Sequence, residues 1–415
     1  MRKLAIVVLI VAFIAGALAL YLEVTTPKAS EGVRFPLTQR QRELLASVPA
    51  NADTFALIPA AAVVRAKLIE NPITRAPISD WAETAQIPRS WMIGGADLVL
   101  WRGEKATSYA IHLDPLRAAV VRIYLMFGSG IDARVTSGTF LINAGAGEPL
   151  GLTRVDQLLA GANGLGAADA IVVQQGRSSN GYPPIGRPSV TAIQIGKDDV
   201  NLVSVAPLSV GQALLPVPGQ AGVPVLHHPR FPANALLAAT FRTPPRVIGD
   251  LDRLFLARVS HLLDNGGSIV LYDVNARTLL PHPDGLIVAK NTPENQALVK
   301  KIEEPATMFG EIRTTNDQLL VAFDKNSMQR YAIENFVDAQ WPSNDWAVRL
   351  DPKRAVPLLE QLGDNTGLRL AAPRIYRSAR DLRRWIGYLS AAQSIEASHS
   401  VTPASEELRV RIASK

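Results

Sequence analysis

The feature that most constrains this chain is an uncharged apolar run of nineteen residues, Leu4–Leu22, which follows Arg2 and Lys3. A helix that rises about 1.5 Å per residue would nearly cross a hydrocarbon core of roughly 30 Å over this length. Cations before such a run keep the N-terminus in the cytoplasm and send the following chain across the membrane. The sequence therefore predicts a transmembrane signal anchor over residues 1–22, with the membrane contacted through residues 4–22.

A cleaved signal peptide is the alternative interpretation of the same residues. Ala17-Leu18-Ala19 offers the small-x-small pattern of a cleavage site. The apolar run continues through Leu20, Tyr21 and Leu22, which favours retention of the segment. Both interpretations place the body of the protein outside the cytoplasm.

Composition narrows the class of protein. A length of 415 residues favours two domains over one core. The net charge of +6 is too small for this length to indicate nucleic-acid binding. The absence of cysteine excludes thiol nucleophiles, disulfides and thiolate metal sites.

Beyond the anchor, turn-rich and periodic stretches divide the chain into four further segments. A tether ends in a short amphipathic helix, whose predicted inner residues are Leu37, Leu44, Leu45 and Val48. Glycine and proline then separate two larger modules, with a predicted hairpin over 190–206 in the separating region. The predicted segments are residues 23–48 for the tether and helix, 49–175 for the first module, 176–232 for the inter-domain region, and 233–415 for the second module with a partial third repeat.

The expected fold class is α+β. Strand-like and helix-like patterns alternate in the order β-α-β-β-α-β-β within the first module, and a similar order recurs in the second. Short connections between strands predict mostly antiparallel sheets covered by helices. Two related modules of this order are therefore expected after the transmembrane helix.

Two stretches, "YAIHLDPLRAAV" at 109–120 and "WAVRLDPKRAVP" at 346–357, share Leu-Asp-Pro followed by an arginine. Aspartate accepts the free amides of a helix's first turn, and proline suits the first helical position. Thr292-Pro293 occupies a similar place before another predicted helix. Threonine replaces aspartate as a cap but not as a catalytic acid, so we interpret Asp114 and Asp351 as helix caps.

No catalytic or metal-binding motif stands out. The histidines lack the spacing that places two ligands on one helix face, and no Gly-x-Ser-x-Gly motif is present. The glycine-rich stretch 161–170 follows a helix pattern and precedes a strand pattern, the reverse of a dinucleotide-binding loop. We therefore predict a non-enzymatic protein without a catalytic residue, metal or cofactor.

One helical pattern suggests a binding surface. In "PRIYRSARDLRRWIGYLSAA", the residues Ile375, Ala379, Leu382, Ile386 and Leu389 form an apolar stripe. Basic residues gather on another face of the same predicted helix. These are Arg377, Arg380 and Arg384. Such a ridge would meet an anionic lipid surface or an acidic partner, although a solvated helix face gives the same pattern.

The chain resembles a family of uncharacterised bacterial envelope proteins with one N-terminal span, a domain of unknown function. The resemblance rests on the span, on "LLASVPANADTFALIP" at Leu44–Pro59, and on the strand-Asp-Pro-helix segments. It implies a single-pass protein of the cell inner membrane, with a cytoplasmic N-terminus and a periplasmic body. It implies no activity and no site residue.

The leading functional hypothesis is a membrane-anchored binding or scaffold protein of the bacterial envelope, with an envelope protein or anionic lipid as partner and no nucleic acid. One alternative is a carrier of a lipid or other apolar ligand, which requires an aliphatic cavity of several hundred Å³. Another is a carboxylate-dependent hydrolase, which requires two acidic groups in one cleft with separated pKa values.

Overall fold

The structure is a computed structural model of the full chain. The residues that it describes are 16–18, 20–21, 24–25, 32–77, 95–102, 107–127, 133–136, 139–142, 147–176, 188–207, 227–242, 249, 252, 259–278, 281–303, 310–383, 385–402 and 405–414. The chain separates into two units. Unit 1 comprises residues 1–197 and 202–209, and unit 2 comprises residues 198–201 and 210–415.

Unit 1 is built on an antiparallel sheet with the strand order β8-β7-β6-β1-β2-β3-β5-β4. The first strand of the chain, β1, lies inside this sheet between β2 and β6. The strands are β1 (Thr54–Ile58), β2 (Leu98–Arg102), β3 (Thr107–Ile111), β4 (Ala133–Thr136), β5 (Thr139–Ile142), β6 (Ala170–Gln174), β7 (Ser189–Ile195) and β8 (Asp199–Pro207, of which 202–207 belong to unit 1).

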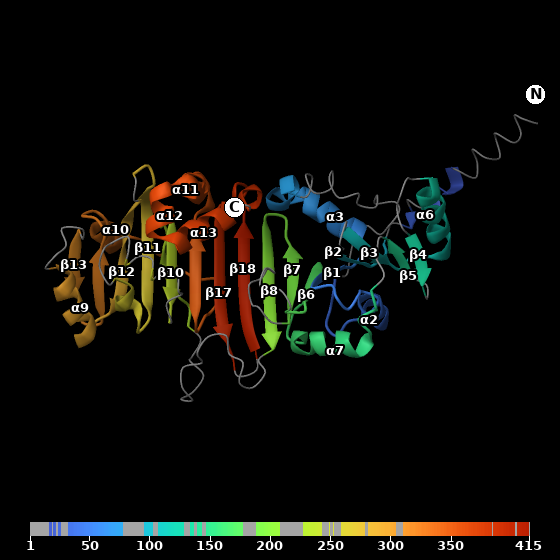
Figure 1. The fold of residues 1–415 in the computed structure, drawn as a ribbon, viewed down its shortest axis with the longest axis horizontal. Helices are drawn as coiled ribbons and strands as arrows, with labels where there is room; N and C mark the ends of the chain where they lie inside the picture. Colours follow the sequence, from blue (N-terminus) through green and yellow to red (C-terminus); the bar gives the residue numbers. More distant parts are fainter. Residues whose placement is uncertain are drawn as a thin grey trace, which may run out of the picture. The chain divides into compact units, whose positions relative to one another are not determined.

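Helices pack on this sheet through buried apolar residues. They are α2 (Gln39–Ala46), α3 (Ala61–Glu70), α6 (Pro115–Phe127) and α7 (Leu152–Leu159), with a short 3₁₀ turn η1 (Ala160–Ala162) after α7. Val64 of α3 and Val155 of α7 are examples of these buried residues. Figure 1 shows α2 and α7 close together. A capping box formed by Thr38 and Gln41 starts α2.

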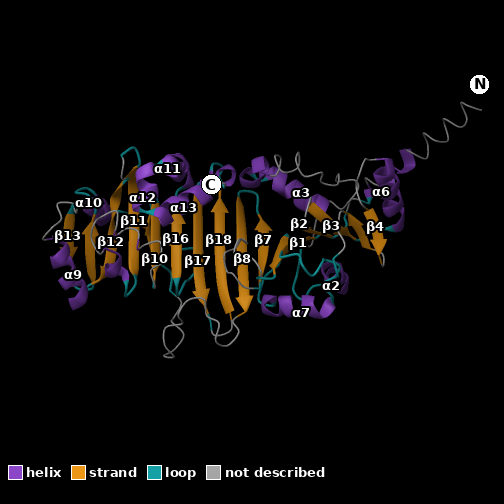
Figure 2. Cartoon of the chain, viewed as in Figure 1, coloured by secondary structure: helices purple, strands orange, loops and turns teal. Residues whose placement is uncertain are grey.

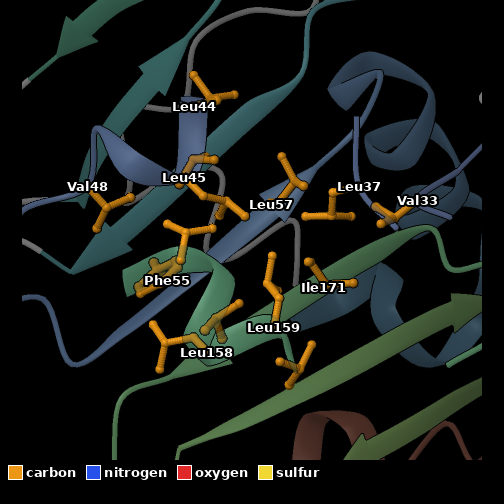
Figure 3. Close-up of a cluster of buried hydrophobic side chains, with 14 of the residues drawn as sticks. Val33, Leu37, Leu44, Leu45, Val48, Phe55, Leu57, Leu158, Leu159 and Ile171 are labelled. Carbon is orange, nitrogen blue, oxygen red and sulfur yellow. The ribbon is translucent and has the colours of Figure 1, made fainter. Parts of the chain in front are cut away.

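The largest core of unit 1 lies where α2 and α7 meet β1 and β6 (Figure 3). Phe55 of β1 and Ile171 of β6 are buried there with Leu158 and Leu159 of α7. The inner residues predicted for the short amphipathic helix are also confirmed as core. Leu37, Leu44, Leu45 and Val48 are all buried in this cluster.

Unit 2 contains a second antiparallel sheet with the order β13-β14-β12-β11-β10-β16-β17-β18. Its strands are β10 (Leu237–Phe241), β11 (Gly267–Asn275), β12 (His282–Lys290), β13 (Glu311–Thr314), β14 (Gln318–Ala322), β16 (Trp346–Leu350), β17 (Ser394–Val401) and β18 (Ser405–Ala413). A small additional ladder joins β9 (Arg230–Pro232) to β15 (Phe336–Asp338).

The two faces of this sheet carry different cores. Phe241, Ile287 and Leu319 pack with η3 (Val259–Leu263) and α9 (Pro293–Glu303) on one face. Tyr272 and Leu286 pack on the other, with Met328 of α10 (Ser327–Ile333). Four helices then lie between β16 and β17 in the chain, and three of them are drawn close together in Figure 2. They are α11 (Pro352–Asp364), α12 (Thr366–Ala371), α13 (Pro373–Arg383) and α14 (Ile386–Leu389).

The transmembrane signal anchor predicted over residues 1–22 is not found. The prediction of a membrane protein with a transmembrane helix is therefore corrected. Among the described residues, no helix is both long and apolar enough to cross a membrane. Most of residues 1–22 lie outside the described part of the chain. Tyr21, near the end of the predicted span, instead donates a hydrogen bond of 3.2 Å to the carboxylate of Asp114. Tyr21 is therefore bound to unit 1 through a polar contact.

The prediction of two modules of β-α-β-β-α-β-β order is also wrong, although the α+β class and the antiparallel pairing agree with the structure. The strand order does not divide into such modules. In unit 1, β6, β7 and β8 extend the sheet from β1. In unit 2, β16 pairs with β10. β16 lies in the segment predicted as a partial third repeat. Sequence periodicity indicates that a strand exists, but pairing between distant strands depends on tertiary packing.

Single elements were predicted more accurately than their assembly. The hairpin predicted over 190–206 is confirmed as β7 and β8. The long helix expected to continue through Leu389 is interrupted, because α13 ends at Arg383 and α14 begins at Ile386.

Candidate functional site

The arginines of the predicted binding surface lie on α13, with one exception. Arg377 and Arg380 are exposed, whereas Arg384 lies outside the described residues. The Nε atom of Arg377 donates to the carbonyl oxygen of Pro373 at 3.2 Å, so this side chain folds back along its own helix. The predicted apolar stripe is buried only in part, because Ala379 is buried and Ile375 half-buried, whereas Leu382 is exposed.

Arg380 lines a depression of about 480 Å³ on unit 2. Tyr376 and Arg383 of α13 lie in the same wall, and Gly363 with Asp364 closes it from the end of α11. Arg383 pairs with Asp364 at 2.9 Å. The Arg383 side chain lies against Gly363, where a Cβ would be in ordinary van der Waals contact with the guanidinium at 3.5 Å.

The charges of this depression are not balanced. Arg383 is neutralised by Asp364, the one acidic side chain among the described residues of the lining. Within the part of the chain that the structure describes, the Arg380 guanidinium has neither a salt bridge nor a hydrogen bond. An exposed cation beside an aromatic ring in a concave surface suits a carboxylate or another oxyanion.

The Leu-Asp-Pro aspartates are confirmed as helix caps. The amide of Arg117 donates to Asp114 Oδ1 at 2.9 Å at the start of α6, and the amide of Arg354 donates to Asp351 Oδ1 at 3.4 Å at the start of α11. Thr292 serves the same purpose at the start of α9, accepting from the Asn295 amide at 3.2 Å. Their side chains therefore satisfy first-turn amides, as a cap requires.

The arginines that follow these caps contribute more than surface charge. The Arg117 side chain is only 3% exposed, and its Nε lies 3.4 Å from Asp114 Oδ2. Arg354 donates to the carbonyl oxygens of Asn234 and Tyr272, with 2.9 Å to the former. Both guanidinium groups therefore stabilise the contacts of their helix starts with neighbouring parts of the chain.

Histidine was predicted to have no functional arrangement, and the described histidines are mostly exposed and separate. Among the described residues, no group of three or more histidine and acidic side chains has the arrangement of a metal site. His112 is half-buried, and His399 is only 7% exposed, with its Nδ1 2.6 Å from Asp345 Oδ2. The ring of Trp346 stacks on that of His399, with 5.6 Å between ring centroids.

The residues around Asp345 form a hydrogen-bonded cluster, here called the clasp, which joins the start of β16 to the end of β17. The Ser343 hydroxyl lies 2.8 Å from the Trp346 carbonyl oxygen and 2.9 Å from that of His399. Asn344 exchanges two side-chain hydrogen bonds with the backbone of Val401, each 2.8 Å long. Since the Ser343 hydroxyl faces carbonyl oxygens, the Ser, His and Asp of this clasp do not have the hydrogen bonding of a catalytic triad.

Two neighbouring carboxylates, Asp284 and Asp324, come closest to the hydrolase hypothesis. Burial, followed by the charge of Asp324, raises the pKa of Asp284. However, the Asp324 carboxylate accepts the amides of Gly285 at 3.0 Å and Asn326 at 2.7 Å, and it also bonds Ser327. The Asp324 carboxylate accepts hydrogen bonds that stabilise a turn. It is therefore poorly placed to act as a general acid or base.

A second concave surface, which sequence reasoning missed, lies at one end of the unit 2 sheet. It is a cleft of about 470 Å³. The ends of β10, β11, β12, β14 and β16 meet there, and the segment 227–229 forms a further wall. Its polar side chains come from positions far apart in the chain. In the sequence, the cations at two strand ends, Arg242 and Lys290, were the indication of this cleft.

Comparisons of the chain with protein-family models, with curated proteins and with solved structures find no match. The resemblance to bacterial envelope proteins therefore stays a prediction.

Proposed function

We propose that this protein is a non-enzymatic binding or scaffold protein that receives an acidic side chain of a protein partner in the depression on α13. The observation that supports this is the unpaired guanidinium of Arg380 beside Tyr376 and Arg383. Arginine presents a planar fork of donors that matches a carboxylate, and an aromatic neighbour adds contact area at low entropic cost.

The charge pattern favours a protein partner over a lipid surface. Asp364 lines the same depression, and Asp381 lies on the same helix among the arginines. An anionic membrane presents a continuous negative surface, which these carboxylates would repel. A protein partner presents separate charges of both signs, and these can complement a mixed surface.

The carrier hypothesis has less support from the described residues. It requires an aliphatic cavity, whereas the depression on α13 is lined mainly by charged side chains. The cleft at the sheet end mixes apolar residues such as Val288 and Trp346 with charged ones, so it is not an aliphatic cavity either. The hydrolase hypothesis depends on Asp284 and Asp324, and the second of these is occupied by backbone amides. Both alternatives stay predictions, as does the extracytoplasmic location of the body, which osmotic-shock fractionation would test.

The proposal is tested by measuring binding of an oligoglutamate peptide to the full chain by fluorescence anisotropy at low ionic strength. Arg380→Gln should weaken binding about two- to fivefold, because one exposed ion pair is worth only about 0.2–1 kcal/mol. Arg377→Gln should have a smaller effect, since its guanidinium already donates to Pro373. Arg122→Gln, an exposed arginine on α6, removes the same charge elsewhere and serves as the matched control.

Equal affinity in wild type and Arg380→Gln would disprove this assignment of the surface. Vesicles of phosphatidylglycerol and phosphatidylcholine provide the second arm of the experiment. Binding to these vesicles that depends on Arg380, without binding to the peptide, would replace the protein partner with a lipid surface.

A further inference from the structure

The cleft at the end of the unit 2 sheet contains two cations on either side of a glycine. Strand pairing sets Phe241, Gly267 and Ala289 side by side across β10, β11 and β12. One residue further along, the same row therefore holds Arg242, Gly266 and Lys290. Neighbouring strands lie about 4.8 Å apart, so the two cations start roughly 10 Å from each other with no side chain between them.

Gly266 is required by the backbone as well as by the cleft. Its φ of +83° is rarely adopted by residues with a side chain. A Cβ there would also lie 3.0 Å from the carbonyl oxygens of both Phe241 and Arg242. The turn before β11 therefore fixes a gap between the two cations.

Hydroxyl groups form the floor of the cleft beside this gap. Side chains alternate along a strand, so Thr240 and Ser268 lie on the same face as Arg242 and Gly266. The Thr240 and Ser268 hydroxyls are 2.8 Å apart, and both residues line the cleft. One hydroxyl of this pair has a proton available for a ligand oxygen.

Within the described part of unit 2, the two cations of the cleft are not neutralised. Among the described residues, neither the Arg242 guanidinium nor the Lys290 ammonium has an ion-pair partner. Asp345 also lines the cleft, but its carboxylate is bound to His399 at 2.6 Å. Asp317 is the remaining acidic group in the lining, so the unpaired charges leave an excess of positive charge.

We propose that this cleft binds the oxyanion group of a small ligand, a carboxylate or a phosphate, between Arg242 and Lys290, with one hydroxyl of the Thr240–Ser268 pair as donor. Guanidinium and ammonium groups are the usual side-chain partners of both anions. Asp317 favours a ligand that carries a hydroxyl or amino group beside the anion, since such a group can donate to the carboxylate. This site is separate from the α13 depression and does not depend on its function.

Calorimetric titration of the full chain with inorganic phosphate, and separately with succinate, tests the proposal. At least one probe should bind saturably with one site per chain. Arg242→Gln and Lys290→Gln should each weaken that binding about tenfold or more, as expected for loss of a charged hydrogen-bond partner. Binding of phosphate alone or succinate alone identifies the anion, and binding of both supports a site that accepts either.

Matched variants separate this site from general charge effects and from the α13 depression. Lys301→Gln removes an exposed lysine of α9 in the same unit and should leave the affinity unchanged, as should Arg380→Gln. Ser268→Ala, which keeps a small side chain at this half-buried position, should weaken binding severalfold, with unfolding transitions confirming that the variant is folded. Failure of both probes to bind saturably, or wild-type affinity in Arg242→Gln and Lys290→Gln, would overturn the proposal.

Discussion

The start of α6 in unit 1 and the start of α11 in unit 2 have the same local sequence, Leu-Asp-Pro-x-Arg, and the same cap. Asp114 and Asp351 each accept the amide of the residue three positions later. The arginine that supplies this amide differs between the two regions. Arg117 is buried against its own cap, whereas Arg354 is exposed and reaches backbone carbonyls instead.

The surroundings cause this difference. In unit 1, Tyr21 donates to Asp114 at 3.2 Å and Arg117 donates to Thr25 at 2.6 Å, so residues from the N-terminal segment enclose the cap. In unit 2, the guanidinium of Arg354 reaches across to Asn234. A short motif therefore specified the backbone of a helix start, and the neighbouring chain decided whether its charges were buried.

The largest expected difference between the two regions comes from removing the arginines. Arg117→Ala should reduce the free energy of unfolding by about 3 kcal/mol, because it leaves a partly buried carboxylate without its cation. Arg354→Ala should cost about 1 kcal/mol, the typical net value of a hydrogen bond at a solvated site. Urea denaturation measures the losses, and hydrogen exchange at α6 and α11 assigns each to its unit. Equal losses would show that burial does not distinguish the two arginines.

Removing the caps should give a smaller difference. Asp114→Ala and Asp351→Ala should each destabilise the protein by about 0.5–2 kcal/mol through loss of the cap. The loss should be greater for Asp114, which also holds Tyr21 and Arg117. Asp351→Thr should restore most of the stability, since Thr292 caps α9 in the native chain. A loss of ligand binding without a loss of stability would reopen the question of a catalytic aspartate.

The smallest expected effect is a pH dependence at α6. Partial burial acts to raise the pKa of Asp114, but hydrogen bonds from the Arg117 amide and the Tyr21 hydroxyl, with the Arg117 charge, lower this pKa overall. Because the pKa of Asp114 is lower in the folded state, its ionisation stabilises the folded state at any pH above the unfolded-state pKa of about 3.9. This stabilisation is lost as the pH falls through the folded-state pKa. Asp114→Asn should therefore lose stability at neutral pH and lose less on acidification than wild type. Parallel pH profiles for the two proteins would contradict this.

Local sequence predicted the elements well because their causes are local. Caps, prolines at first helical positions and apolar stripes located α2, α6, α9 and α11. The predicted transmembrane anchor failed, as did the modular sheet order, because each required a decision about what the segment packs against. Arg377 and Arg380 were found from helical spacing alone, whereas the cleft at Arg242 and Lys290 was missed, since strand register brings these residues together from distant parts of the chain.

The sequence by itself determined where helices and strands begin, which residues form their apolar sides, and that thiol chemistry is absent. Those properties depend on backbone preference, side-chain period and composition, which act over a few residues. Only the tertiary structure decided that β16 lies beside β10, that Arg117 is buried, and that two cations face each other across Gly266. Each of these contacts joins residues far apart in the chain, and packing of the whole unit selects it from many locally equivalent pairings.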